Sequence, residues 1–338
     1  MTPASVLRGI GSHLPARAVS NDELARQLDT SDEWIRSRTG IGQRFVVEPG
    51  ECTSDLAVHA GRAALRHAGL FQVDAVVLAT STPDFSCPAT APAVAARLGL
   101  AGAAAFDVGA VCTGFVYALA VAHGLIAGSV ARSVLVIGAD CFSTITDPAD
   151  RTTRAIFGDG AGAVVLTAGE QDEPGALLGF ELGSDGSREE LIQVPGGGSR
   201  QRCGALAADA SPYFAMQGKA VFMQAVLGMA KSSQAVLDQL GWRPEQVDHL
   251  VAHQANLRIL SATAEQLGLP PERLVCNIAR VGNTVAASVP LALHDAERAG
   301  RIRPGERVLL TAFGGGLTWG AAALRWPELP LSPSDSPA

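Results

Sequence analysis

The sequence has few aromatic residues, few charged residues and no long apolar run. Of its 338 residues, 5% are aromatic and 17% are charged, whereas 47% are apolar. The core must therefore be built from small aliphatic side chains, as in a compact, glycine-rich α/β protein. No stretch reaches the roughly 18 apolar residues that a membrane span needs, and the N-terminus has no charged start followed by an apolar run. We therefore expect no membrane partner and a cytoplasmic location.

The cysteines and charges exclude further classes of protein. No CxxC pair and no Cys/His cluster occurs, which disfavours both a disulfide framework and a metal site. The net charge of −7 disfavours a nucleic-acid partner, because such a partner requires a positive surface. The scattered cysteines are expected to be reduced thiols; they are Cys52, Cys87, Cys112, Cys141, Cys203 and Cys276.

Strand and helix patterns alternate along the whole chain. The first half has predicted strands at 6–10, 74–79, 104–108, 133–137 and 161–166. Its predicted helices lie at 20–27, 54–68, 91–98 and 113–127, and a capping box at 30–33 opens a further short helix. The second half repeats the rhythm, with helices at 218–240, 257–267 and after residue 283, and strands at 248–251 and 307–312.

This repetition predicts two duplicated α/β halves. They would span residues 1–175 and 176–326, each built on a mostly parallel or mixed sheet covered by helices. Residues 327–338 contain four prolines and little to bury, so we expect them to be disordered.

Cys112 stands where a predicted strand meets a predicted helix with almost no loop between them. The positive end of the helix dipole would favour the thiolate, which is the nucleophilic form of cysteine. The helix that follows is apolar nearly all round, so it should be buried and should hold Cys112 at the floor of a pocket. The other five cysteines are expected to be small buried residues that pack like alanine.

Three further features resemble parts of an acyl-transfer site. His253 and Asn283 each lie between a strand or glycine turn and a helix start, where α/β proteins place active-site groups. The run from Phe313 to Gly316 offers bare backbone N–H groups suited to an oxyanion hole. Each feature alone would be structural, but together they provide a thiol, an imidazole, a carboxamide and a backbone anion site.

Two other interpretations of these motifs are weaker. Papain-like proteases also have Cys, His and Asn in this order with a His roughly 130 to 150 residues after the Cys, but their Cys-Gly-Ser-Cys-Trp run is absent here. The glycine-rich run at 158–162 lacks the GxGxxG spacing and precedes a strand, so it indicates a structural turn rather than a phosphate site.

The motifs together resemble the β-ketoacyl-acyl-carrier-protein synthase III family of the thiolase superfamily over residues 4–326. They are Cys112-Thr113-Gly114-Phe115, Phe157-Gly158-Asp159-Gly160-Ala161-Gly162-Ala163, His253-Gln254-Ala255-Asn256-Leu257-Arg258, Gly282-Asn283-Thr284 and Phe313-Gly314-Gly315-Gly316. The resemblance implies a thiolase-like fold, a cytoplasmic homodimer, acyl-CoA and malonyl thioester as substrates, no covalently bound cofactor, and an acyl-carrier protein as a partner.

The resemblance also implies roles for single residues. Cys112 would take the acyl group, and His253 and Asn283 would stabilise the enolate formed when carbon dioxide leaves the malonyl thioester. Backbone N–H groups of Cys112 and Gly315 would hold the oxyanion, with Phe313 shaping the pocket. Coenzyme A would contact Thr30, Trp34, Arg38, Arg151, Gly218 and Asn256.

Departures from the family pattern concern the substrate and the partner. The expected acyl pocket has a smaller residue at Cys87 and at Ala155 and a larger one at Phe142, so its shape should differ. For docking of the carrier protein, Arg258 is present and Lys219 is a substitute basic residue, while Glu265 and Gln266 replace a lysine pair.

Three functions remain open from the sequence. The first is decarboxylative Claisen condensation of an acyl-CoA primer with malonyl-acyl-carrier protein, which would start fatty-acid or polyketide synthesis. The second passes the acyl group from Cys112 to an alcohol or an amine. The third is a non-catalytic acyl-binding protein, which the intact Cys112, His253 and Asn283 disfavour.

Overall fold

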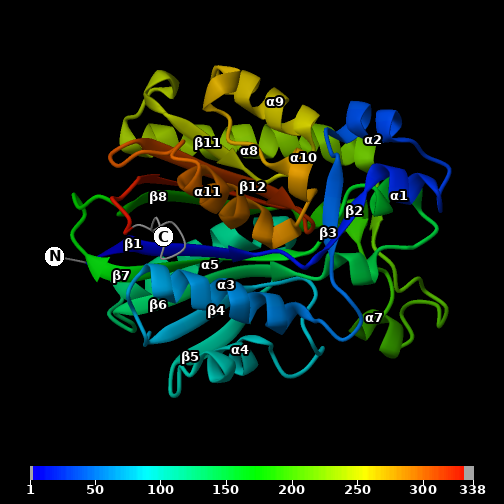
Figure 1. Ribbon diagram of the computed structural model, residues 1–338, viewed down its shortest axis with the longest axis horizontal. Helices are drawn as coiled ribbons and strands as arrows, with labels where there is room; N and C mark the ends of the chain where they lie inside the picture. Colours follow the sequence, from blue (N-terminus) through cyan, green and yellow to red (C-terminus); the bar gives the residue numbers. More distant parts are fainter. Residues whose placement is uncertain (1–2, 331–338) are drawn as a thin grey trace, which may run out of the picture.

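Alternating layers of helix and sheet make up the protein (Figure 1), a computed structural model that describes residues 3–330. The first large sheet has the strand order β1-β7-β6-β4-β5, and the second has the order β11-β12-β13-β8. The strands are β1 (Ala4–His13), β4 (Ala75–Ala79), β5 (Ala104–Val108), β6 (Ser133–Asp140), β7 (Gly160–Gly169), β8 (Leu177–Ser184), β11 (His249–Ala252), β12 (Arg307–Gly314) and β13 (Thr318–Arg325). Two small sheets pair β2 (Arg17–Ser20) with β3 (Gln43–Val46) and β9 (Ile192–Gln193) with β10 (Ala215–Met216).

Both large sheets are mixed. In the first, β4 pairs in parallel with β5 and β6, whereas β7 runs antiparallel to β1 and β6. In the second, β11 and β12 are parallel, and β13 is antiparallel to both β12 and β8. The α/β class predicted from the alternating pattern is confirmed, but antiparallel pairs are as prominent as parallel ones.

The main helices lie on the outer faces of the two large sheets and between the sheets. They are α1 (Asn21–Ala25), α2 (Asp32–Thr39), α3 (Thr53–His67), α4 (Ala91–Leu98), α5 (Gly114–Ala127), α6 (Arg151–Arg154), α7 (Ser199–Arg202), α8 (Gly218–Leu240), α9 (Leu257–Gln266), α10 (Ile278–Val281) and α11 (Ser288–Arg298). Helices α3 and α4 pack on the outer face of the first sheet, α8 packs on the second and carries α9, and α5 and α11 lie between the two sheets (Figure 1). The apolar character of α5 is explained by this position, because both of its sides face protein.

Short 3-10 helices lie at six points along the described chain. They are η1 (Val111–Thr113), η2 (Phe142–Ile145), η3 (Gly186–Leu191), η4 (Pro244–Gln246), η5 (Pro271–Arg273) and η6 (Val285–Ala287). Two of them lead directly into the central helices, since η1 precedes α5 and η6 precedes α11. These two turns contact each other.

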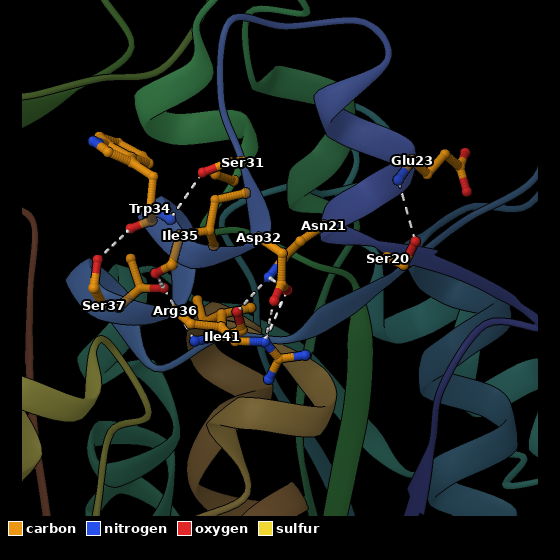
Figure 2. A network of polar contacts seen from close by, with 12 residues as sticks. Ser20, Asn21, Glu23, Ser31, Asp32, Trp34, Ile35, Arg36, Ser37 and Ile41 are labelled. Atoms are coloured by element: carbon orange, nitrogen blue, oxygen red, sulfur yellow. Dashed lines mark hydrogen bonds and ion pairs between the residues drawn. The ribbon is translucent and has the colours of Figure 1, made fainter.

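Helix α2 begins one residue later than predicted. Its N-cap is Ser31 and not Thr30: the Ser31 hydroxyl accepts a hydrogen bond from the Trp34 N–H at 3.1 Å (Figure 2). The buried Thr30 Oγ1 has no hydrogen-bond partner among the described residues. Both residues can cap a helix, and the extended backbone at Ser31 decides between them.

Strands β8 and β13 were not predicted. Their sequences contain glycine and small residues, and β13 begins two residues after the glycine run that ends at Gly316. The strands form because each pairs along its length with a neighbour, a contact that local sequence does not reveal.

The predicted boundary at residues 175 and 176 falls in the connection between β7 and β8. After β13, the carbonyl oxygen of Pro330 lies 2.7 Å from His67 Nε2. Leu329 packs on the central core, so the predicted disorder does not describe residues 327–330. Residues 331–338 of that segment lie outside the described residues. Within 3–330, no helix is both long and apolar enough to cross a membrane.

Candidate active site

Cys112, His253 and Asn283 line one cavity of about 740 Å³. Cys112 lies in η1, after β5; His253 follows β11; and Asn283 lies between α10 and η6. Cys112 and His253 follow strands of different large sheets, so the fold brings together three predicted catalytic side chains that are distant in sequence. Among residues 3–330, no group of three or more His, Cys, Asp or Glu side chains is placed to hold a metal ion.

The backbone around Cys112 is tightly packed. A side chain at Gly314 would place its Cβ 2.8 Å from the Cys112 backbone nitrogen, so the glycine allows β12 to approach the nucleophile. Val111, the preceding residue, has a φ of +47°, which a β-branched residue rarely adopts. The turn therefore holds Cys112 in a conformation that the surrounding structure imposes.

The protonation of Cys112 differs from the prediction. Burial raises the pKa of the Cys112 thiol far above its usual range, and the nearby Asp140 carboxylate raises it further. A helix N-terminus favours the thiolate, but here desolvation is the larger effect. The raised pKa therefore favours the neutral thiol of Cys112 over the thiolate.

His253 is buried, and hydrogen bonds fix both its backbone and its ring. Its backbone N–H donates to the Thr311 carbonyl at 2.8 Å, and its ring Nδ1 lies 2.6 Å from the hydroxyl oxygen of Ser288. Burial lowers the pKa of His253 to about 3, so the imidazole is neutral at ordinary pH. A neutral imidazole with Nδ1 engaged leaves Nε2 for the cavity.

Asn283 is oriented by the turn that follows it. Its Oδ1 accepts a hydrogen bond from the Val285 N–H at 2.9 Å, and Val285 has a φ of +52°. Backbone hydrogen bonds with Ile156 and Gly158 fix the main chain of Asn283 against the segment between α6 and β7. With Oδ1 engaged in the turn, the Nδ2 end of the carboxamide is the donor available for chemistry.

Asp140 lies beneath this arrangement and was not singled out from the sequence. One carboxylate oxygen accepts the Ser81 N–H at 2.7 Å, and the other accepts the Ala286 N–H at 3.0 Å. Thr80 and Thr82 hydroxyls also donate to it. Burial raises the pKa of Asp140 to about 7. The side chain thus ties the ends of β4 and β6 to η6, the turn that positions Asn283.

The outer end of the cavity is lined by residues predicted to bind coenzyme A. Trp34, Arg38, Gly218 and Asn256 are among the lining residues. Arg151 does not line the cavity, but its guanidinium lies 5.2 Å from the centre of the Trp34 ring. An aromatic ring with a stacked cation at a cavity mouth is suited to a planar ring system. Thr30 is not a lining residue.

Helix α2 presents Trp34 in a fixed direction. Asp32 accepts hydrogen bonds from Asn21 Nδ2 and from Arg36 Nε, each at 2.8 Å, and this network lies on the side of α2 away from Trp34 (Figure 2).

Asn256 is also structural in part: its Nδ2 donates to the Arg38 carbonyl, and its Oδ1 caps α9 by accepting the Arg258 N–H.

The inner end of the cavity contains one of the three predicted acyl-pocket residues. Ala155 lines it, whereas Phe142 is buried behind Phe157 and Phe214, with ring centres 4.6 and 4.9 Å away. Cys87 is exposed and does not line the cavity. Phe214 was missed from the sequence because it lies in the irregular segment before β10.

The oxyanion and docking roles both stay predictions, although most of the residues predicted for them line the cavity. Phe313 lines the cavity together with Gly314, whereas Gly315 does not, and a side chain there would meet Ile192. An oxyanion role for the Gly315 N–H stays a prediction. Lys219 and Arg258 both line the cavity.

The low pKa of His253 predicts how stability changes with pH. Below pH 6.5 the unfolded chain binds a proton at this residue while the native imidazole stays neutral down to about pH 3. The free energy of unfolding should therefore fall by up to ~1.4 kcal/mol per pH unit below 6.5. Denaturant titrations would measure this change. Between pH 6.5 and about pH 5, we expect the free energy of unfolding to fall by up to ~2 kcal/mol more in wild type than in His253→Gln. Parallel pH profiles would contradict the burial of a neutral His253; Asp140, which titrates in the opposite sense, is common to both proteins.

Comparison with known proteins identifies the family of this chain. The family model described as 3-oxoacyl-[acyl-carrier-protein] synthase III matches residues 106–186, and the model of the C-terminal part of that family matches residues 237–326. β-Ketoacyl-[acyl-carrier-protein] synthase III 3 of Streptomyces coelicolor is 61% identical over 97% of this chain and 99% of its own length.

Solved structures are similar over nearly the same length. The 3-oxoacyl-(acyl carrier protein) synthase III of Pseudomonas aeruginosa PAO1 superposes with a TM-score of 0.92 at 57% identity, covering 97% of this chain and 99% of that one. The priming β-ketosynthase of the R1128 polyketide pathway gives a TM-score of 0.90 at 34% identity, with 97% of each chain covered. The chain thus has the thiolase-like fold, belongs to the β-ketoacyl-[acyl-carrier-protein] synthase III family, and is an acyltransferase.

Proposed function

We propose that this enzyme condenses an acyl-CoA primer with malonyl-acyl-carrier protein, with loss of carbon dioxide, through a thioester on Cys112. The observation that carries this function is the convergence of Cys112, His253 and Asn283 on one cavity whose outer end is lined by Trp34 and Arg38. The names of the relatives favour condensation over transfer of the acyl group to an alcohol or an amine.

The first half-reaction is an exchange of thioesters. The Cys112 sulfur forms a bond to the acyl carbon, the bond from that carbon to the coenzyme A sulfur breaks, and the thiol proton ends on the departing coenzyme A. Because Cys112 starts as a neutral thiol, the exchange is neutral overall. Backbone N–H groups of Cys112 and Gly315 would hold the oxyanion of the tetrahedral intermediate.

The second half-reaction forms the carbon-carbon bond. The C–C bond to the malonyl carboxylate breaks, and its electron pair becomes the enolate of the remaining thioester. His253 and Asn283 would each donate a hydrogen bond to the enolate oxygen, which gains charge in this step. The enolate carbon then attacks the acyl carbon on Cys112, and the Cys112 sulfur leaves as a thiolate that takes up a proton from water to restore the thiol.

The partners follow from the outer surface of the site. Lys219 and Arg258 provide positive charge beside the cavity of a protein whose net charge is −7, which suits an acidic carrier protein.

A homodimer is supported by β5, an edge strand of the first sheet that keeps partly exposed apolar residues. A second copy is also the expected source of Cys87 for the acyl pocket. Six free cysteines suit the reducing cytoplasm.

The coenzyme A part of the proposal predicts a selective effect of Trp34→Ala. Loss of the ring removes stacking and its contact with Arg151, so we expect the KM for acyl-CoA to rise about ten-fold, or ~1.4 kcal/mol, with kcat nearly unchanged. Intact-protein mass spectrometry after timed incubation with a panel of acyl-CoAs would measure the rate of acylation and identify the preferred primer.

An acyl-pantetheine substrate provides the control, because it carries the same thioester without the nucleotide. Its acylation rate should be the same in wild type and Trp34→Ala. An equal loss with both substrates would show that Trp34 supports the fold of the site and does not bind the nucleotide.

A further inference from the structure

Ser288 is the direct neighbour of the catalytic histidine and has no role in the prediction from sequence. It is the first residue of α11 and is completely buried. Its Oγ lies 2.6 Å from His253 Nδ1, and the Gln254 backbone N–H donates to the same oxygen at 3.3 Å. The hydroxyl therefore lies between the imidazole and the backbone of the next residue.

The direction of the bond between Ser288 and His253 follows from counting donors and acceptors. A hydroxyl has one hydrogen to donate and two lone pairs to accept with. The Gln254 N–H can only donate, so it uses one lone pair of Ser288 Oγ. Among the described residues, His253 Nδ1 is the only hydrogen-bonding neighbour left to accept the hydroxyl hydrogen.

The opposite arrangement would leave a buried hydrogen unpaired. If Nδ1 carried the imidazole proton, it would donate to Oγ, and the Ser288 hydroxyl hydrogen would have no acceptor in a position with no solvent exposure. Buried donors without acceptors are strongly disfavoured. The neutral state of His253 makes this choice decisive, because a neutral ring carries its single proton on one nitrogen only.

We propose that Ser288 is a positioning residue that donates its hydroxyl hydrogen to His253 Nδ1 and so fixes the imidazole proton on Nε2, facing the cavity. This inference rests on the proposed function for its effect on catalysis. In this tautomer Nε2 is a hydrogen-bond donor, as the developing enolate oxygen requires. The same tautomer cannot accept a proton at Nε2, so His253 is not the base that deprotonates Cys112.

The tautomer can be observed directly. Side-chain nitrogen-15 NMR of the full-length enzyme labelled at histidine, with His253→Gln used to assign the signals, distinguishes a protonated from an unprotonated ring nitrogen. We expect wild-type His253 to show a protonated Nε2 and an unprotonated, hydrogen-bonded Nδ1 at neutral pH. A protonated Nδ1 would overturn the proposal whatever the enzyme's activity.

The effect on catalysis is tested with Ser288→Ala. We expect the acylation of Cys112 by acyl-CoA to change less than about two-fold, while release of carbon dioxide from the malonyl thioester falls about ten-fold or more. Ser288→Thr keeps the hydroxyl and should recover most of the lost rate. An equal loss in both half-reactions, or no loss in either, would contradict a role in setting the donor.

Ser5→Ala is the matched control. Ser5 is also completely buried, and its Oγ lies 2.7 Å from His123 Nδ1, but neither residue lines the catalytic cavity. This variant should leave both half-reactions unchanged. If wild type is acylated but never releases carbon dioxide, the proposed condensation fails, while the NMR result still decides the tautomer of His253.

Discussion

Cys112→Ser should abolish acylation by acyl-CoA while leaving the fold intact. Serine has nearly the same volume, so the packing of η1 against Gly314 is retained. Its hydroxyl is a much poorer nucleophile toward a thioester, and the buried position that raises the pKa of the thiol disfavours an alkoxide even more. We expect the rate of acylation, measured by intact-protein mass, to fall by at least about 10³-fold.

An exposed cysteine supplies the control for this experiment. Cys203 is free and exposed, so it can exchange with thioesters without the catalytic site. Cys203→Ser should therefore retain the full rate of acylation. Acylation of Cys112→Ser at the wild-type rate would place the nucleophile elsewhere, and peptide mapping of the modified protein would identify it.

Asn283→Ala should separate the two half-reactions. Acylation of Cys112 does not require the carboxamide donor, so its rate should stay within about two-fold of wild type. Decarboxylation of the malonyl thioester should fall about 10² to 10³-fold, which is the usual cost of losing one donor to a developing oxyanion. Acylation is followed by intact mass, and decarboxylation by release of labelled carbon dioxide.

Asn283→Asp distinguishes loss of the donor from damage to the turn. The alanine variant also removes the acceptor of the Val285 N–H, and such a buried unpaired group costs about 1–3 kcal/mol. Aspartate keeps that acceptor but replaces the Nδ2 donor with an oxygen. Both variants should lose decarboxylation to a similar extent, and full condensation by either would overturn the assignment of Asn283.

Much of the fold could be predicted from the sequence, because hydrophobic periodicity marks the buried elements. Helix α8 has the predicted bounds, and β5 and α4 do as well. The antiparallel strands β8 and β13 could not be recognised, since their small residues form strands only through pairing with neighbours. Strand direction likewise depends on contacts between segments far apart in the chain.

The chemistry of the site was only partly predictable. The predicted catalytic residues stand at junctions between strands or turns and helices, which local sequence reveals. The protonation of Cys112 was predicted in the wrong direction, because a helix end can be recognised from sequence whereas the degree of burial cannot. Asp140 and Ser288 were missed for a similar reason: each acts through residues about 35 or more positions away.

The most direct test of the account is a single-turnover reaction of enzyme already acylated on Cys112 with malonyl-acyl-carrier protein. The account predicts that each acyl group lost from Cys112 appears in one β-ketoacyl product together with one molecule of carbon dioxide. Loss of the acyl group to an added alcohol or amine, with no carbon dioxide released from the malonyl thioester, would contradict it.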